Sequence, residues 1–203
     1  MARYTGPKWK LSRREGIDLF GRPGSKFQRV GRTTQPPGVH GPKQFRGKMS
    51  SFGEHLREKQ KARRIYGILE KQFRRYYEKA KNISGNTADI FAQSLELRLD
   101  NVVYRLGFTA TRSQARQLVN HGHVLVNGKK VDISSFSVSV GDIISVKPKA
   151  AKFNIILENL EAKHSIPNWL SRKSIVGKVN TLPKVEDLDM GVKYNLIIEY
   201  YSR

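Results

Sequence analysis

The sequence of 203 residues contains no cysteine, no long apolar run and few acidic residues. The absence of cysteine excludes disulfide bonds, cysteine-based zinc sites and thiol nucleophiles. No apolar run approaches the length that crosses a bilayer, and Met1–Tyr4 has no hydrophobic signal core, so we expect no membrane association. Apolar residues make up only 38%, which indicates that part of the chain does not fold alone.

The charge is strongly unbalanced, with 38 Lys and Arg against 17 Asp and Glu and a formal net charge of +21. Because a compact protein with this charge repels itself, the sequence predicts a polyanionic partner and not merely a solvated basic surface. Residues 1–81 alone hold 22 Lys and Arg against 6 Asp and Glu. We therefore expect the polyanion to be bound mainly by the first part of the chain.

Glycine and proline interrupt residues 1–48 at short intervals, as in Pro36-Pro37-Gly38. This spacing predicts a disordered or extended basic arm that orders on its partner. Ser12–Glu15 has the spacing of a capping box, which is compatible with a short helix near residues 12–19. The candidate contacts of the arm are its basic residues Arg3, Lys8, Lys10, Arg13, Arg14, Lys43, Arg46 and Lys48.

A helical segment is expected from Ser51, because Ser51–Glu54 is a capping box ahead of an apolar pattern with helical spacing. Gly67 is expected to divide it into two helices. The apolar side, predicted to form core, consists of Ala62, Ile65, Tyr66, Leu69, Phe73, Tyr76, Tyr77 and Ala80. The opposite side carries a basic stripe of Arg57, Lys61, Arg64, Lys71 and Arg75. Since like charges repel and no acid interrupts this side, the stripe favours phosphate contact over simple solvation.

The hydrophobic period changes from helix to strand near residue 123. One helix is predicted from Thr87 to about Leu106, and a shorter one starts at the capping box Thr111–Gln114. Asn127-Gly128 between two apolar runs predicts a two-residue β-hairpin. The expected later elements are two strand pieces within 136–146, a helix at 153–163, a loop at 166–169 and a strand at 194–201.

The segment 98–146 places a basic-faced helix beside a hairpin with cations near its tip. Arg112 and Arg116 are four residues apart, and both are expected to point away from the apolar side of the helix. Such a surface suits the shape and phosphates of folded RNA better than a duplex groove, although composition alone does not exclude DNA. The candidate RNA contacts here are Arg112, Arg116, His121, His123, Asn127, Lys129 and Lys130.

Three strings in this segment are distinctive: R-L-D-N-V-V-Y-R-L-G at 98–107, T-R-S-Q-A-R-Q-L-V-N-H-G-H-V-L-V-N-G at 111–128 and V-x-x-G-D-x-I at 138–144. Further strings lie outside it, including L-S-R-R-E-G at 11–16, P-P-G-x-H-G at 36–41 and L-R-E-K-Q-K-x-R-R-I-Y-G at 56–67. Together they resemble the family of bacterial small-subunit ribosomal protein four over essentially the whole chain. Many members carry a cysteine zinc knuckle in the arm, where this chain has residues such as Trp9, Ser12 and Lys26, so it resembles the zinc-free form.

The resemblance implies an α+β fold, in which a helical domain is split in sequence by an inserted α/β RNA-binding domain with a small, mostly antiparallel sheet. The domain boundaries expected on this basis are 1–48 for the basic N-terminal arm, 49–94 with 183–203 for the helical domain, and 95–182 for the inserted domain. The RNA-binding motif would span 98–146.

The resemblance also implies a function without catalysis or cofactor, in the cytoplasm and within the small ribosomal subunit. The family binds the 5′ domain of small-subunit (16S-type) rRNA, nucleates assembly of the subunit body and contributes to decoding accuracy. Its other partners are small-subunit ribosomal proteins five and three, and mRNA at the channel through which it enters the subunit. No small-molecule substrate is implied.

Two other classes of protein are possible in principle. Arg98-Leu99-Asp100 resembles a catalytic tripeptide of some pseudouridine synthases, but we expect Asp100 to be a surface carboxylate or the partner of an arginine, and the chain has no room for a catalytic domain. His121 and His123 have no third ligand nearby, so no metal site is expected. A non-ribosomal RNA-binding module, such as a recycling factor, would lack the arm and the 56–67 string.

Overall fold

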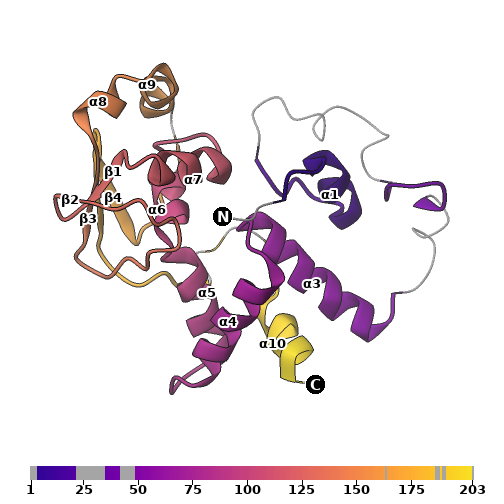
Figure 1. The fold of residues 1–203 in the computed structure, drawn as a ribbon. Helices are drawn as coiled ribbons and strands as arrows, with labels where there is room; N and C mark the ends of the chain where they lie inside the picture. The colour runs from indigo at the N-terminus through magenta and orange to yellow at the C-terminus, as the bar shows by residue number, and fades with distance from the viewer. Residues whose placement is uncertain are drawn as a thin grey trace. The chain divides into compact units, whose positions relative to one another are not determined.

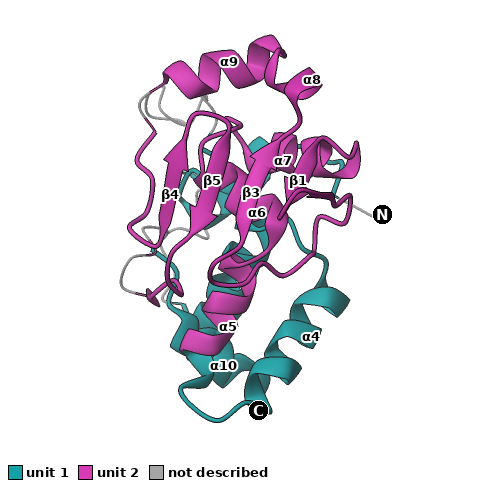
Figure 2. Ribbon diagram, turned by 90° about the vertical axis from the view of Figure 1, so that its left-hand side faces the viewer, with its two compact units in different colours: residues 1–88, 191–203 teal, residues 89–190 magenta. Residues whose placement is uncertain are grey.

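The computed structural model describes residues 4–21, 35–41, 49–162, 164–185, 188 and 191–202 (Figure 1). The chain divides into two compact units, unit 1 with residues 1–88 and 191–203, and unit 2 with residues 89–190 (Figure 2). The predicted α+β class is confirmed, because helices combine with one small sheet whose strands pair in antiparallel fashion. The finer division at residues 48, 94 and 182 stays a prediction.

Unit 1 contains α1 (Lys8–Glu15), α3 (Ser51–Ile65), α4 (Glu70–Lys81) and α10 (Tyr194–Ser202). The expected helix of the arm lies four residues earlier than 12–19, because Gly16 adopts a left-handed conformation and ends it. Ser50, and not Ser51, caps α3, since its Oγ accepts the N–H of Gly53 at 3.2 Å. The predicted break at Gly67 is confirmed by its φ of 63° between α3 and α4.

The predicted apolar side of α3 and α4 forms the core of unit 1, with Ala62, Ile65, Tyr66, Phe73, Tyr77 and Ala80 buried. Leu69, in contrast, is 43% exposed. The strand predicted at 194–201 is wrong, because this segment is the helix α10, which packs on α3. Tyr194 and Ile197 are three residues apart and both buried, which is the spacing of one helix face.

The first helix of unit 2 is α5 (Thr87–Glu96), whose first two residues still belong to unit 1, and α6 (Leu99–Arg105) and α7 (Arg112–Asn120) follow it. The prediction of one helix from Thr87 to Leu106 is wrong, because the chain is extended at Arg98. There the N–H of Leu99 bonds to the carbonyl of Phe136 at 2.8 Å, and the carbonyl of Leu97 accepts the N–H of Val138 at 2.9 Å. The backbone at the break is therefore satisfied by a distant segment. The predicted cap of α7 is confirmed, since Thr111 Oγ1 accepts the N–H of Gln114.

The sheet of unit 2 has the strand order β2-β1-β3-β5-β4. Its strands are β1 (Val124–Val126), β2 (Lys129–Lys130), β3 (Ile143–Val146), β4 (Leu170–Lys173) and β5 (Val176–Val179). The predicted β1–β2 hairpin is confirmed, and positive φ angles at Asn127 and Gly128 make its two-residue turn. Of the two strand pieces expected within 136–146, only β3 is a strand, because Ser137 makes an isolated bridge with Arg98.

The core of unit 2 lies between one face of the sheet and the helices α6 and α7. Val124, Ile144 and Val179 point to this face, where Leu106 and Val119 cover them. The remaining helices, α8 (Pro148–Ala151) and α9 (Asn154–Glu161), lie at one end of the sheet (Figure 2). The helix predicted at 153–163 is thereby confirmed within two residues. No helix among the described residues is long and apolar enough to span a membrane.

Candidate nucleic-acid interface

The candidate cations of the arm are only partly described. Arg3, Lys43, Arg46 and Lys48 lie outside the described residues. Lys8, Lys10, Arg13 and Arg14 all lie on α1, where Lys10 and Arg14 are exposed. Arg13 Nε donates to the carbonyl of Gln35 at 3.1 Å, which fixes this guanidinium against a second segment of the arm.

The basic stripe of α3 meets a buried carboxylate. The side chain of Glu15 on α1 is only 2% exposed and pairs with Arg57 at 3.2 Å and with Arg64. Burial raises the pKa of Glu15, although the two arginines act to lower it. Lys61 pairs with Glu58 at 2.7 Å. The expectation that no acid interrupts this stripe is therefore wrong, because Glu15 reaches it from a helix 42 residues away in sequence.

Lys71 and Arg75, the other two residues of the predicted stripe, lie on α4 and are exposed. The stripe thus separates into two parts with different environments. Arg57 and Arg64 form ion pairs with Glu15, and Lys61 forms one with Glu58. Lys71 and Arg75, in contrast, face solvent. A phosphate can approach the exposed pair without competing with Glu15 or Glu58.

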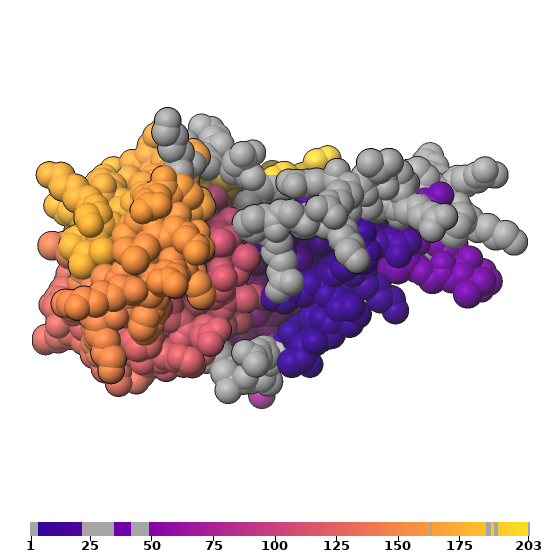
Figure 3. All heavy atoms as spheres, turned by 90° about the horizontal axis from the view of Figure 1, so that it is seen from above, coloured from indigo at the N-terminus to yellow at the C-terminus, as the bar shows by residue number. Residues whose placement is uncertain are grey.

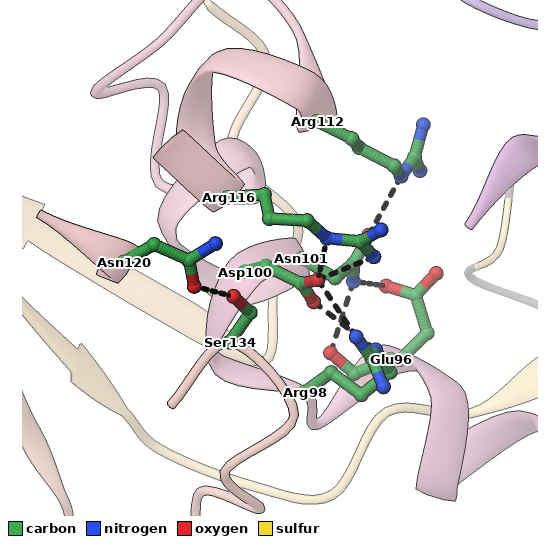
Figure 4. A network of polar contacts seen from close by, with 8 residues as sticks. All are labelled: Glu96, Arg98, Asp100, Asn101, Arg112, Arg116, Asn120 and Ser134. Carbon is green, nitrogen blue, oxygen red and sulfur yellow. Dashed lines mark hydrogen bonds and ion pairs between the residues drawn. The ribbon is translucent and has the colours of Figure 1, made fainter. Parts of the chain in front are cut away.

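A network of buried polar groups joins α6 to α7 (Figure 4). Asp100 is 3% exposed and accepts hydrogen bonds from Arg98 and from Arg116, whose Nε and a terminal nitrogen lie 2.9 and 2.7 Å from Asp100 Oδ2. The expectation that Asp100 is a surface carboxylate is wrong, while the alternative that it partners an arginine is confirmed. A buried charge of this kind is tolerated because it is fully paired.

Glu96 forms the second centre of the network and is fully buried. It accepts from Arg105 at 3.1 Å through both carboxylate oxygens, and from Asn101 Nδ2 at 2.8 Å. The other amide atom, Asn101 Oδ1, accepts Arg112 Nε at 2.8 Å, and this guanidinium lies 4.4 Å from the ring centre of Tyr104. Asn101 therefore connects the carboxylate to α7.

Arg112 and Arg116 consequently contact acceptors on α6. The helical spacing predicted only that both side chains leave α7 on the side away from its apolar residues. Four arginines gather in this network: Arg98 and Arg116 donate to Asp100, Arg105 donates to Glu96, and Arg112 donates to Asn101, which itself donates to Glu96. Because guanidinium groups donate through several N–H groups in a fixed plane, Arg112 and Arg116, which are held in this way and are only partly buried, are preorganised for phosphate.

The hairpin carries the next cations along the chain. Lys129 and Lys130 are exposed on β2, where Lys130 lies 3.5 Å from Asp132. Asn127 is occupied within the protein, because its amide donates to Asp142 at 2.8 Å and its Oδ1 accepts the N–H of Ile143 at 2.9 Å. Asn127, predicted as an RNA contact, therefore stabilises the turn that precedes Lys129 and Lys130.

His121 and His123 follow α7 with ring centres 6.1 Å apart. In the part of the chain that the structure describes, no group of three His, Asp or Glu side chains is placed to hold a metal ion. The sequence interpretation missed Glu15, Glu96 and Asn101. A signal existed for Glu96, which stands between Leu95 and Leu97 inside an apolar pattern, where a carboxylate requires a buried partner.

An α+β chain with this cluster of arginines and a lysine-bearing hairpin has the features of an RNA-binding protein. Residues 3–96 match the family model described as "Ribosomal protein S4/S9 N-terminal domain", and residues 97–144 match the model described as "S4 domain". The small ribosomal subunit protein uS4 of Herpetosiphon aurantiacus is 52% identical over the full length of both chains. The proteins of that name in Sulfurihydrogenibium sp. and Thermoanaerobacter sp. are 49% and 48% identical, again over both full lengths.

The chain belongs to the small ribosomal subunit protein uS4 family. It is therefore a component of the small ribosomal subunit that carries an RNA-binding domain, and it is not an enzyme. This confirms the resemblance that the sequence strings indicated. The individual RNA contacts stay predictions.

Proposed function

We propose that this protein binds the 5′ domain of small-subunit rRNA directly, nucleates assembly of the subunit body and contributes to decoding accuracy. The observation that carries the proposal is that unit 2 gathers four arginines in the α6–α7 network and exposes Lys129 and Lys130 on β2. The net charge of +21 supports the same partner, since rRNA is the polyanion of the subunit.

The contacts divide into two kinds. Arginines of the network have fixed positions and are suited to recognise the shape of folded RNA through its phosphates. The exposed cations of α1, α4 and β2 lie at the surface and contribute mainly electrostatic attraction. The proposed protein partners, small-subunit proteins five and three, and the proposed contact with mRNA rest on the family resemblance.

The test is the affinity of the full chain for a transcript of the 5′ domain, measured against an unrelated structured RNA of equal length over a range of salt concentrations. We expect preference for the 5′ domain and a steep fall of log K with log salt. Replacing Lys129 and Lys130 by Gln should lower the steepness by about one unit per lost phosphate contact. Lys173→Gln, at an exposed position of β4, is the matched control.

Equal affinity for both RNAs, or a nearly flat salt dependence, would contradict direct rRNA recognition. The role in assembly is tested by reconstitution of small subunits with this protein withheld. We expect the 5′ domain to fail to compact, and later proteins of that domain to bind poorly. Crosslinking in reconstituted subunits then tests the proposed contacts with proteins five and three.

A further inference from the structure

A cluster of rings and cations lies in unit 2 where α7, β1, α8 and the start of α9 converge. His123 precedes β1, and its ring centre lies 5.3 Å from that of Phe153 at an interplanar angle of 87°. The backbone N–H of Lys147 bonds to the carbonyl of His123 at 2.9 Å, which ties the start of α8 to the same place. We call His121, His123, Lys147, Lys149 and Phe153 the ring–lysine cluster.

The aromatic side chain of Phe153 has no role in capping α9, the helix that follows it. Phe153 is the N-cap residue of α9, a position that favours Ser, Thr, Asp or Asn, and it provides no side-chain cap. Its backbone carbonyl alone accepts the N–H groups of Ile156 and Leu157. The side chain is 40% exposed, and the atoms of α8 and α9 (orange) lie on the outer surface in Figure 3. Neither the cap of α9 nor burial therefore accounts for an aromatic side chain at this position.

The charges around these rings are of one sign. Partial burial lowers the pKa of His123, and the positive charges of His121, Lys147 and Lys149 lower it further. The aliphatic part of the Lys130 side chain packs over Gly122, the residue between His121 and His123 in the sequence. Among the described residues, no carboxylate pairs with His121, His123, Lys147 or Lys149. Like charges held together in this way are relieved by an anionic ligand.

We propose that the ring–lysine cluster binds an unpaired nucleotide of RNA, with the base stacked on Phe153 and the adjacent phosphates beside Lys147 and Lys149. Exposed aromatic rings next to cations are the usual platform for single-stranded RNA, because every base offers a face for stacking. A fully paired helix has no free base face to offer, so the cluster selects a loop, bulge or end. This inference rests on the proposed rRNA binding. The sequence analysis named His121 and His123 as RNA contacts but did not include Lys147, Lys149 or Phe153.

The test compares Phe153 variants of the full chain for binding to the 5′-domain transcript and to a fully paired RNA of equal length. We expect Phe153→Leu, which keeps apolar bulk but removes the ring, to weaken binding to the transcript by about 5- to 100-fold. Phe153→Tyr keeps the ring and should bind like the wild type. Neither variant should change the salt dependence or binding to the paired RNA, because Phe153 carries no charge.

Ile155→Ala provides the matched control, since Ile155 is 51% exposed on the same helix and should leave RNA affinity unchanged. The melting temperature of each variant separates loss of a contact from loss of the fold. Wild-type affinity in Phe153→Leu, equal losses in Phe153→Leu and Phe153→Tyr, or an equal loss for paired RNA would overturn the stacking site. The stacking site would also be overturned if Phe153→Leu kept its RNA affinity but lost a contact with another protein in reconstituted subunits. If the wild type itself fails to bind the transcript, it is the proposed function that fails.

Discussion

Replacing Arg116 by Ala should destabilise unit 2, although the position looks like a surface cation in the sequence. Two N–H groups of Arg116 donate to Asp100 Oδ2 at 2.9 and 2.7 Å, and the side chains are 19% and 5% exposed. Removing one partner of a buried ion pair costs about 3–5 kcal/mol, because the other charge is left unpaired. Here Arg98 still holds Asp100 at 2.7 Å. We therefore expect a loss of about 2–4 kcal/mol in the free energy of unfolding.

The assay is urea unfolding of the full chain, with three comparison variants. Arg112→Ala loses the hydrogen bond to Asn101 and the cation–π contact with Tyr104, and should cost about 1–2 kcal/mol. Leu118→Ala, which removes core volume at a position 8% exposed, should cost about 2–5 kcal/mol. Lys129→Ala, at an exposed position, should stay within about 0.5 kcal/mol of the wild type.

Combining Arg116→Ala with Asp100→Asn separates the ion pair from its surroundings. If the two groups interact as the structure indicates, the double variant should lose less stability than the sum of the single losses, by about 1–3 kcal/mol. Arg116→Ala with the stability of the wild type, or strictly additive losses, would refute the assignment of Arg116 to the fold. RNA affinity measured on the same variants then shows what this arginine contributes beyond the ion pair.

Three further outcomes are expected. Burial alone would raise the pKa of Glu70, yet hydrogen bonds from Lys59 and Tyr201 hold it below its usual value. The stability that this carboxylate contributes is therefore complete above its unfolded-state pKa and is lost as pH falls through the lower folded-state pKa. In Glu70→Gln, the free energy of unfolding measured with urea should consequently fall less steeply as pH decreases from about 6 to 3. Ile197→Ala empties a fully buried position on α10 and should cost about 2–5 kcal/mol in the same assay; an unchanged midpoint would mean that α10 is not part of the core. RNA bound at the ring–lysine cluster adds negative charge beside His123, whose neighbours His121, Lys147 and Lys149 are cationic, and so raises its pKa. Affinity should then rise as pH falls from about 7.5 to 5.5 at constant ionic strength, and His123→Gln should reduce that rise.

Local signals in the sequence were sufficient for much of the fold. The capping box at Thr111, the break at Gly67 and the Asn127-Gly128 turn each depend on residues within four positions of one another, and each was predicted correctly. The family strings likewise identified the class of protein from the order of residues alone. Local chemistry of this kind is readable because its hydrogen bonds close within the same turn.

The errors share a different cause, which is contact between distant segments. The break at Arg98 depends on the backbone of residues 136–138, and the helix at 194–202 depends on packing against α3. The direction of Arg112 and Arg116 depends on acceptors on α6, which helical spacing on α7 alone does not reveal. The stripe was expected to carry no acid, but the carboxylate of Glu15 on α1 is buried among its cations. In each case a tertiary partner decided between alternatives that the local pattern left equal.

The arrangement of unit 1 has a consequence for how the protein is made. Helices α3 and α4 are synthesised before residues 89–190, whereas α10, which packs on α3, is synthesised after them. At about 5–20 residues per second, the roughly 110 residues between α4 and α10 delay completion of this core by about 5 to 20 seconds. Unit 2 is continuous in sequence, so no later segment of the chain is needed to complete its core. During that interval, while unit 2 is being synthesised, the part of α3 that α10 later covers stays exposed, and the nascent chain is open to aggregation and to chaperones.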